Sequence, residues 1–400
     1  MCRVVNVLIV VFIFSVPWHD MVEFPGVGTL ARMLGAAAFV VGMGTILMNN
    51  RIRPLQGVHL WIGLFTLWVW LTLFWSVWPE KTQEYAFSMV QLFLFSILMW
   101  QFIRTREDLR EAWQALVLGG YVLIFFTLQS WFSGHQASFN RYAAEGVNEN
   151  ELAAMLALGI PVALHLLMED RNIGWKLINL LYIPAALSAI VLSASRTGFV
   201  IASVGSLYAL VIFQRSRLAW RVITAVSVIG LIVALLPMIP QTSLDRLATI
   251  GHEASSGTLT GRTTIWKYGL LAWQEHPIVG HGLGAFRKAV NPFSISESAH
   301  NTFISLLVET GLIGILIFSA FLLALLRLLP QVPHQDRRFQ IILMGCLLLT
   351  QMSTEWSMEK IAWVLYSLLI SHAWLDNQQI ILRWRLTPSP LSVIPKTAHV

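Results

Sequence analysis

Two arginines lie in polar segments between long apolar runs, and their side chains suit phosphate chemistry. Arg196 stands in SASRTG, a short break between apolar runs 177–194 and 198–213, and Arg262 begins the polar stretch GRTTIWKYG. An arginine stays charged and presents a planar fork that matches phosphate oxygens. The pair therefore predicts a clamp for a diphosphate. The alternative for each arginine is that it snorkels to lipid headgroups or caps a helix.

A histidine is the candidate base. His300 stands in ESAHN, directly before the apolar run that begins near residue 302. The positive amino end of a helix lowers the pKa of a histidine, and a neutral imidazole can accept a proton from an attacking hydroxyl. A polar cap at the membrane interface is the alternative. Glu309, nine residues further on, falls near the opposite helix face, so we interpret it as a structural partner for a cation or a backbone group.

Other charged residues receive weaker assignments. Lys81 in SVWPEKT and Arg141 in FNRYAAEG are tentative substrate-binding residues, with snorkelling as the alternative, whereas snorkelling alone explains Arg32. The acidic residues in the polar segments that carry these cations are scattered. They lack the close pair of carboxylates that a metal-dependent transferase usually presents. His276 and His281 span a proline and a glycine and lack a helical frame for metal binding. We therefore predict no catalytic metal and no cofactor.

The composition is that of a membrane protein. Of the 400 residues, 56% are hydrophobic and only 12% are charged, whereas soluble chains carry roughly 25% charged residues. We predict an all-α, polytopic helical bundle of about twelve transmembrane helices that forms a single domain over 1–400. The net charge of +6 does not indicate nucleic-acid binding, because the cations form short clusters between apolar runs. The runs fall near 4–18, 27–48, 57–75, 83–103, 112–132, 150–168, 177–194, 198–213, 222–239, 302–329, 340–356 and 360–376.

The distribution of arginine and lysine among the short loops predicts the orientation. Cations gather in every second short loop, and the positive-inside rule then places both termini in the cytoplasm. A loop over 240–301 would face the periplasm, and residues 377–400 would form a cytoplasmic tail. Within the loop, apolar residues at spacings of three and four predict an amphipathic helix over 262–275. Pro277 and the glycines that follow predict a tight turn.

The ordered motifs SASRTGFV, GRTTIWKYGLLAWQEHPIVGHGLGAF and SAHNTFISLLVETGLIG resemble the bacterial O-antigen ligase and polymerase superfamily of membrane glycosyltransferases. The resemblance implies a C-type fold and metal-independent transfer of a glycan from undecaprenyl diphosphate on the periplasmic face of the inner membrane. It also implies that Arg196 and Arg262 bind the diphosphate and that His300 activates the acceptor. In the ligases the acceptor is a sugar hydroxyl of the lipid A core.

Three functions stay open at this point. A ligase and a polymerase of the same superfamily differ only in the acceptor, and nothing in the sequence identifies it. A non-enzymatic transporter would be favoured by inverted repeats or by charged residues at the membrane midplane, and we see neither. We predict an O-antigen ligase, with an O-antigen or exopolysaccharide polymerase as the alternative and a transporter as the minor one.

Overall fold

The computed structural model describes residues 2–24, 26, 28–49, 52–138, 141–213, 261–295 and 297–386. The side chains of 210–213, 331, 334, 335 and 378–386 are not described. Helices dominate these ranges, and the strands form one two-stranded antiparallel sheet. The α-helices are α1 (Cys2–Ser15), α2 (Leu30–Asn49), α3 (Gly57–Leu71), α4 (Pro79–Phe102), α5 (Arg106–Phe132), α6 (Glu149–Glu169), α7 (Ile173–Leu192), α8 (Arg196–Phe213), α12 (Arg262–Trp273), α13 (Phe286–Ala289), α14 (Thr302–Leu326), α15 (His334–Gln351) and α16 (Lys360–Leu386). Short 3-10 turns are η1 (Val16–Met21), η2 (Thr72–Phe74), η5 (Asn291–Phe293) and η6 (Leu329–Gln331), and the strands are β1 (Glu23–Phe24) and β2 (Gly28–Thr29).

The prediction of an all-α, polytopic membrane protein is confirmed. Eight helical segments among the described residues are long and apolar enough to cross a membrane. Each predicted apolar run falls on a helix, except 222–239, which lies outside the described residues. Residues 240–260 of the predicted loop also lie outside them, as do 387–400 of the predicted tail. Helix α16 continues to Leu386, past the start predicted for that tail.

Polar side chains set the helix starts that matter for the site. The Asn148 side chain accepts hydrogen bonds from the backbone N–H groups of Asn150 and Glu151, and thereby caps α6. Asn301 caps α14 in the same way, through the N–H groups of Phe303 and Ile304. Asparagine is among the best residues for this purpose, since its oxygen satisfies donors that have no partner within the helix. Both caps fix the backbone next to a predicted site residue.

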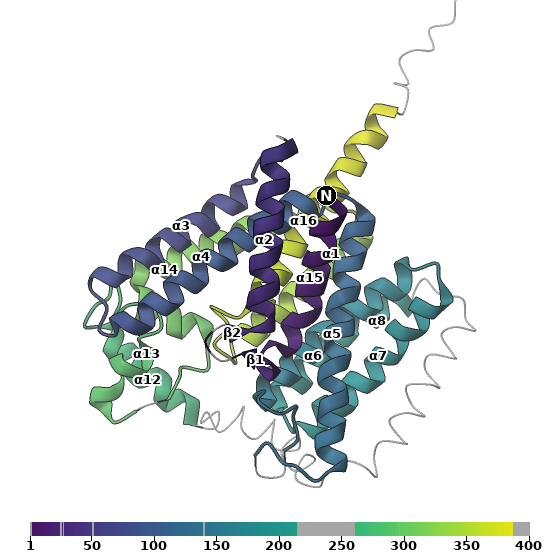
Figure 1. Ribbon diagram of the computed structural model, residues 1–400. Helices are drawn as coiled ribbons and strands as arrows, with labels where there is room; N and C mark the ends of the chain where they lie inside the picture. The colour runs from purple at the N-terminus through teal and green to yellow at the C-terminus, as the bar shows by residue number, and fades with distance from the viewer. Residues whose placement is uncertain are drawn as a thin grey trace, which may run out of the picture.

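The helices form two outer groups and a central group that joins them (Figure 1). On one side α14 packs against α3 and α12, and on the other the strongly buried α6 packs against α7, α8, α5 and α15. Helices α1, α2 and α16 lie between the two groups. The amino terminus and the carboxyl end of α16 lie at one end of the bundle, and α12 and α13 lie at the other. The start of α1 and the described end of α16 thus lie at the same end of the bundle, and the side of a membrane that they face stays a prediction.

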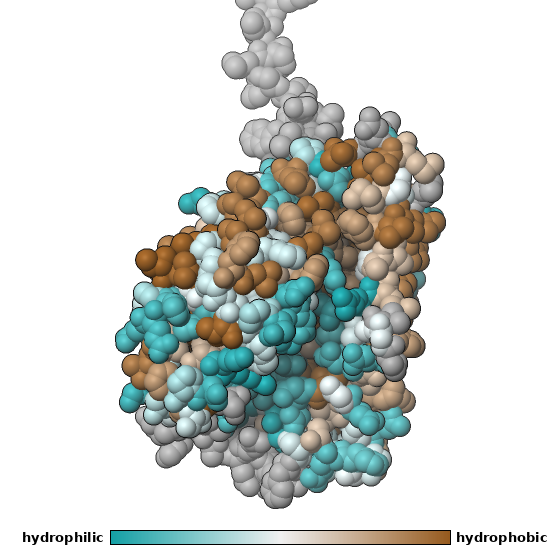
Figure 2. All heavy atoms as spheres, turned by 60° about the vertical axis from the view of Figure 1, so that its left-hand side comes forward, coloured by the Kyte–Doolittle hydropathy of each residue, from teal (hydrophilic) through white to brown (hydrophobic). Residues whose placement is uncertain are grey.

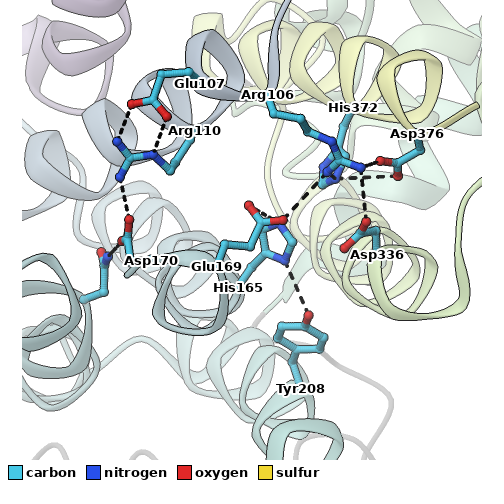
Figure 3. Close-up of polar contacts among 11 residues, drawn as sticks. Arg106, Glu107, Arg110, His165, Glu169, Asp170, Tyr208, Asp336, His372 and Asp376 are labelled. Carbon is cyan, nitrogen blue, oxygen red and sulfur yellow. Dashed lines mark hydrogen bonds and ion pairs between the residues drawn. The ribbon is translucent and has the colours of Figure 1, made fainter. Parts of the chain in front are cut away.

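A cluster of charged side chains joins four helices near the end that carries the termini (Figure 3). The guanidinium of Arg106 on α5 contacts Asp376 on α16, lies 3.5 Å from Asp336 on α15 and lies 3.7 Å from Glu169 on α6. Asp376 is fully buried, so its charge requires such a partner. The cluster therefore fixes α5, α6, α15 and α16 relative to one another.

Candidate functional site

Arg196 lies at the sharp turn between α7 and α8. The turn contains Ala194 with a positive φ of 50°, and Arg196 is the first residue of α8. The Ser195 hydroxyl donates to the Asn150 side chain at 3.0 Å and accepts from the Gly198 N–H at 3.2 Å. The start of α6 and the turn are thus joined next to Arg196, which fixes where this arginine leaves the backbone.

Arg141 braces the same turn. Its Nε donates to the Ser193 carbonyl and its second guanidinium nitrogen donates to the Asn150 side chain, both at 2.8 Å. A third contact reaches the Glu149 carboxylate at 3.6 Å. These contacts give Arg141 a structural role beside Arg196. That it also binds substrate stays a prediction.

The predicted amphipathic helix is α12, with Arg262 as its first residue. Ile265 and Ala272 on its inner face are buried in a small core with Phe286 and Val308. The Trp266 indole N–H donates to the Ala299 carbonyl at 2.8 Å. Because Ala299 directly precedes His300, this bond holds the candidate base next to the helix that carries Arg262.

The predicted tight turn packs against a kink in α14. Gly311 breaks α14 with φ 65° and ψ −168°, a conformation that is essentially restricted to glycine. The freed backbone bonds to the turn: the N–H groups of His281 and Gly282 donate to the carbonyls of Val308 and Glu309, at 3.1 and 2.8 Å. A Cβ on Gly280 would collide with the Glu309 carbonyl. The turn and the helix therefore form one unit.

Glu309 has the structural role expected of it. The side chain is buried, and its Oε1 accepts a hydrogen bond from the Phe286 N–H at 3.0 Å. Phe286 is the first residue of α13, so the carboxylate holds the start of that short helix. The partner is a backbone group rather than a cation.

The charge of Arg196 acts on Arg262, and the charge of Arg262 acts on His300. Burial lowers the pKa of Arg262, and the nearby charge of Arg196 lowers it further. Burial is also the first cause of the lowered pKa of His300, followed by the charge of Arg262, while Glu297 acts in the opposite direction. The sequence predicts a lowered pKa from the helix start, but desolvation by burial is its main cause. The lowered pKa favours the neutral imidazole of His300, with the charge of Arg262 nearby.

Sequence reasoning did not single out Arg287 on α13. Its charge also lowers the pKa of His300, after that of Arg262. It lines a polar cavity of about 410 Å³ together with Ser298, two residues before His300. Hydrophilic residues surround a hollow on the corresponding face of the molecule (Figure 2). The sequence signal for Arg287 was its position in the polar segment between apolar runs. That signal did not distinguish Arg287 from the other cations of the segment.

Carboxylates dominate the wall of this cavity. Its lining includes Glu355 and Glu359, from the loop between α15 and α16. Burial raises the pKa of both, and for Glu359, where the charge of Glu151 adds to the effect, the pKa rises to about 8. Carboxyl groups and carboxylates both bind sugar hydroxyls, so the cavity offers hydrogen-bonding partners suited to a glycan. The full lining is His19, Asp20, Glu84, Tyr85, Ser88, Gln91, Leu92, Glu151, Arg287, Ser298, Glu355, Ser357, Met358, Glu359 and Lys360.

Lys81 is paired with residues of the cavity wall. Its ammonium lies 2.8 Å from Glu84, one turn further along α4, and above the ring of Tyr85. It is not among the residues whose charge influences His300 or Arg262. Lys81 as a substrate-binding residue therefore stays a prediction.

Side chains of the types that ligate metals lie together at the opposite end of the bundle. His281, one of the two histidines considered for metal binding, has its Nε2 2.8 Å from the Ala272 carbonyl. This contact stabilises the turn that contains His281. Among the described residues, His165, Asp336 and His372 are the three that lie close enough to share an ion. Arg106 already supplies positive charge there, with a nitrogen 3.4 Å from the His372 ring and 3.5 Å from Asp336 (Figure 3).

Two comparisons with known proteins bear on the family that this chain resembles. The O-antigen ligase family model matches residues 181–319, which include Arg196, Arg262 and His300. The exopolysaccharide production protein ExoQ of Rhizobium meliloti (strain 1021) is 26% identical over 289 residues, which are 66% of this chain and 63% of that protein. The chain thus spans less than two thirds of this relative's length. Together with the helical membrane fold, these matches support the resemblance of the chain to the O-antigen ligase and polymerase superfamily.

Proposed function

We propose that this protein is an O-antigen ligase, which transfers a glycan from undecaprenyl diphosphate to a sugar hydroxyl of the lipid A core at the periplasmic face of the inner membrane. One observation carries the proposal. Arg196 at the start of α8 acts on the pKa of Arg262 at the start of α12, and Arg262 acts on that of His300 before α14, which supports a shared site. A diphosphate leaving group needs matched positive charge, and a sugar hydroxyl needs a base.

Each residue has a defined part in the transfer. The guanidinium groups of Arg196 and Arg262 bind the diphosphate oxygens of the donor. The acceptor hydroxyl oxygen attacks the anomeric carbon while His300 takes the hydroxyl proton. The bond from that carbon to the phosphate oxygen breaks, and undecaprenyl diphosphate leaves with the electron pair. Direct displacement inverts the anomeric configuration and forms no glycosyl-enzyme. The residues themselves neutralise the charge, so we propose that the reaction needs no metal.

The test uses purified full-length protein, a lipid-diphosphate glycan donor and two acceptors supplied separately. Lipid A core alone should give a glycosylated product, whereas donor repeat units alone should not be extended. Extension of repeat units without transfer to lipid A core would show a polymerase instead. That alternative is favoured by the relative whose name concerns exopolysaccharide production. Retained anomeric configuration, or activity that appears only after a divalent ion is added to chelated enzyme, would contradict the mechanism.

Conservative substitution tests the clamp. An ammonium cannot reproduce the bidentate fork of a guanidinium. Arg262→Lys and Arg196→Lys should therefore weaken donor binding, measured with undecaprenyl diphosphate, and lower transfer. Lys267→Arg on the same helix as Arg262 is the matched control and should leave both unchanged. Unchanged donor affinity in both clamp variants would remove the proposed phosphate contacts.

A further inference from the structure

A second cavity, of about 390 Å³, opens between α1, α2 and α4. Most of its walls along the helices are apolar or small, as at Phe12, Ala31, Gly35, Ala36, Phe39 and Phe95, whereas α4 adds the polar Ser88 and Gln91. Helix α2 packs mainly against α1 and much less against α4, which leaves room between α2 and α4. Small residues on α2 widen this room, so the groove can hold an apolar chain that runs along the helices.

Two cations stand at one end of the groove. Arg32 lies in the first turn of α2, and Lys360 is the first residue of α16. Within the described part of the chain, no carboxylate lies within ion-pair distance of either side chain, although Glu23 also lines the groove. The charges of Glu359 and Asp20 act on Lys360 without forming an ion pair with it, and apolar walls with two cations at one end match a lipid chain that carries an anionic head.

The groove leads to the proposed active site. Ser88, Gln91 and Lys360 line both this groove and the polar cavity that contains Arg287 and Ser298. A molecule whose head lies at Lys360 can therefore extend hydrophilic groups into the polar cavity, toward His300. Neither Arg196 nor Arg262 lines either cavity as described. The groove is thus distinct from the arginine pair assigned to the donor.

We propose that the groove between α1, α2 and α4 binds the acceptor, as a phosphorylated glycolipid, with its chain along α2, its phosphate at Arg32 and Lys360 and its sugars in the polar cavity. The inference rests on the proposed function, because it assigns the groove to the acceptor of that reaction. It explains why Arg32, which snorkelling alone could account for, faces a groove together with Lys360. It also assigns the acceptor lipid and the donor lipid to different sites on the protein.

Direct binding tests the groove without relying on catalysis. Full-length protein in phosphatidylcholine nanodiscs is titrated with lipid A core and with the same lipid after enzymatic removal of its phosphates. Loss of the phosphates should weaken binding by about tenfold to a hundredfold, the usual range for charge-assisted hydrogen bonds. Equal binding of the two lipids would overturn the assignment of the phosphate to Arg32 and Lys360.

Two neighbouring alanines provide a matched pair of variants. Ala36 and Ala37 are both exposed on α2, but only Ala36 lines the groove. Ala36→Phe should fill the groove and weaken lipid A core binding at least tenfold, with undecaprenyl diphosphate affinity unchanged, whereas Ala37→Phe should change neither. Arg32→Gln should weaken the binding of phosphorylated lipid A core more than that of the dephosphorylated lipid. Arg32→Lys should retain part of the affinity for the phosphorylated lipid.

The outcomes separate this proposal from the proposed function. If Ala36→Phe weakens the binding of undecaprenyl diphosphate instead of the binding of lipid A core, the groove holds the donor and the inference is wrong. If Ala36→Phe and Ala37→Phe bind lipid A core alike, the groove does not hold the acceptor, even where wild-type protein transfers glycan normally. If wild-type protein binds lipid A core through the groove but glycosylates neither acceptor, the proposed function fails and the lipid site stands.

Discussion

At the scale of single residues, the environment of His300 determines its chemistry. Its backbone has a positive φ of 47°, directly before the Asn301 cap, so the residue is held in an uncommon conformation. Such conformations persist where the surrounding structure enforces them, and they concentrate at functional sites. Here the Trp266 bond to the preceding carbonyl and the cap that follows enforce it. His300 is thereby held beside α12, whose Arg262 lowers the pKa of the ring.

Removal of the imidazole should separate binding from chemistry. His300→Ala should bind donor nearly normally and transfer glycan roughly 100- to 10,000-fold more slowly, the usual range for general-base catalysis. His135→Ala, which removes an exposed histidine from another loop, is the control and should have wild-type rates. Single-turnover transfer and donor binding measure the two effects. Near-normal transfer by His300→Ala would show that another group is the base.

The pH profile should follow the lowered pKa of His300. A base must be deprotonated, so the rate should fall as the pH drops through the pKa of the folded protein, which lies below the ordinary value of 6.5. The charge of Arg287 contributes to that lowering, so Arg287→Gln should move the acidic limb to higher pH. Lys288→Gln is the neighbouring control. An acidic limb that Arg287→Gln leaves in place would contradict the predicted proximity.

At the scale of elements, α14 positions most of the site. His300 precedes its cap, the kink at Gly311 receives the turn, and Glu309 holds the start of α13, which carries Arg287. The Thr302 hydroxyl also donates to the Thr354 carbonyl and accepts from the Trp356 N–H, at 2.9 and 2.8 Å. These bonds tie the loop that carries Glu355 to the same helix start. Helix α14 thus positions the candidate base His300, the cation Arg287 and the loop that carries Glu355.

Substitution at the kink should disturb all of them. Gly311→Ala places a side chain in a conformation that costs about 1–3 kcal/mol, and its Cβ would collide with the Ile278 carbonyl. We expect a lower melting temperature together with reduced transfer. Gly44→Ala in α2, whose Cβ would meet no atom within 4 Å, is the matched control. A Gly311→Ala protein with unchanged melting and transfer would contradict the role of the kink.

The sequence predicted the helices better than the contacts between them. Apolar runs of spanning length and the three-and-four spacing in residues 262–273 are local patterns, so periodicity was enough to find α12 and the spanning helices. The kink at Gly311 depends instead on a distant turn, and the cavity at Arg287 depends on five elements meeting. Long-range contacts of this kind are set by packing, which periodicity does not encode.

At the scale of the whole molecule, the orientation in the membrane is the main expectation to test. Cys2 is exposed at the start of α1, and Cys346 is buried within the bundle. A membrane-impermeant maleimide should therefore leave wild-type protein unlabelled in spheroplasts and label Cys2 once the membrane is permeabilised. With Cys2→Ser as background, Ser298→Cys should react in intact spheroplasts. Labelling of Cys2 from the periplasmic side, or of position 298 only after permeabilisation, would invert the topology and exclude the proposed site.

The packing of the bundle has a consequence for donor binding. Arg196 belongs to the helices packed around α6, whereas Arg262 and His300 belong to those packed around α14. A diphosphate held by both arginines would span the two groups and act as a crosslink between them. Because bound ligand stabilises whatever state binds it, the donor should do more than occupy a site: it should make two helical groups unfold as one.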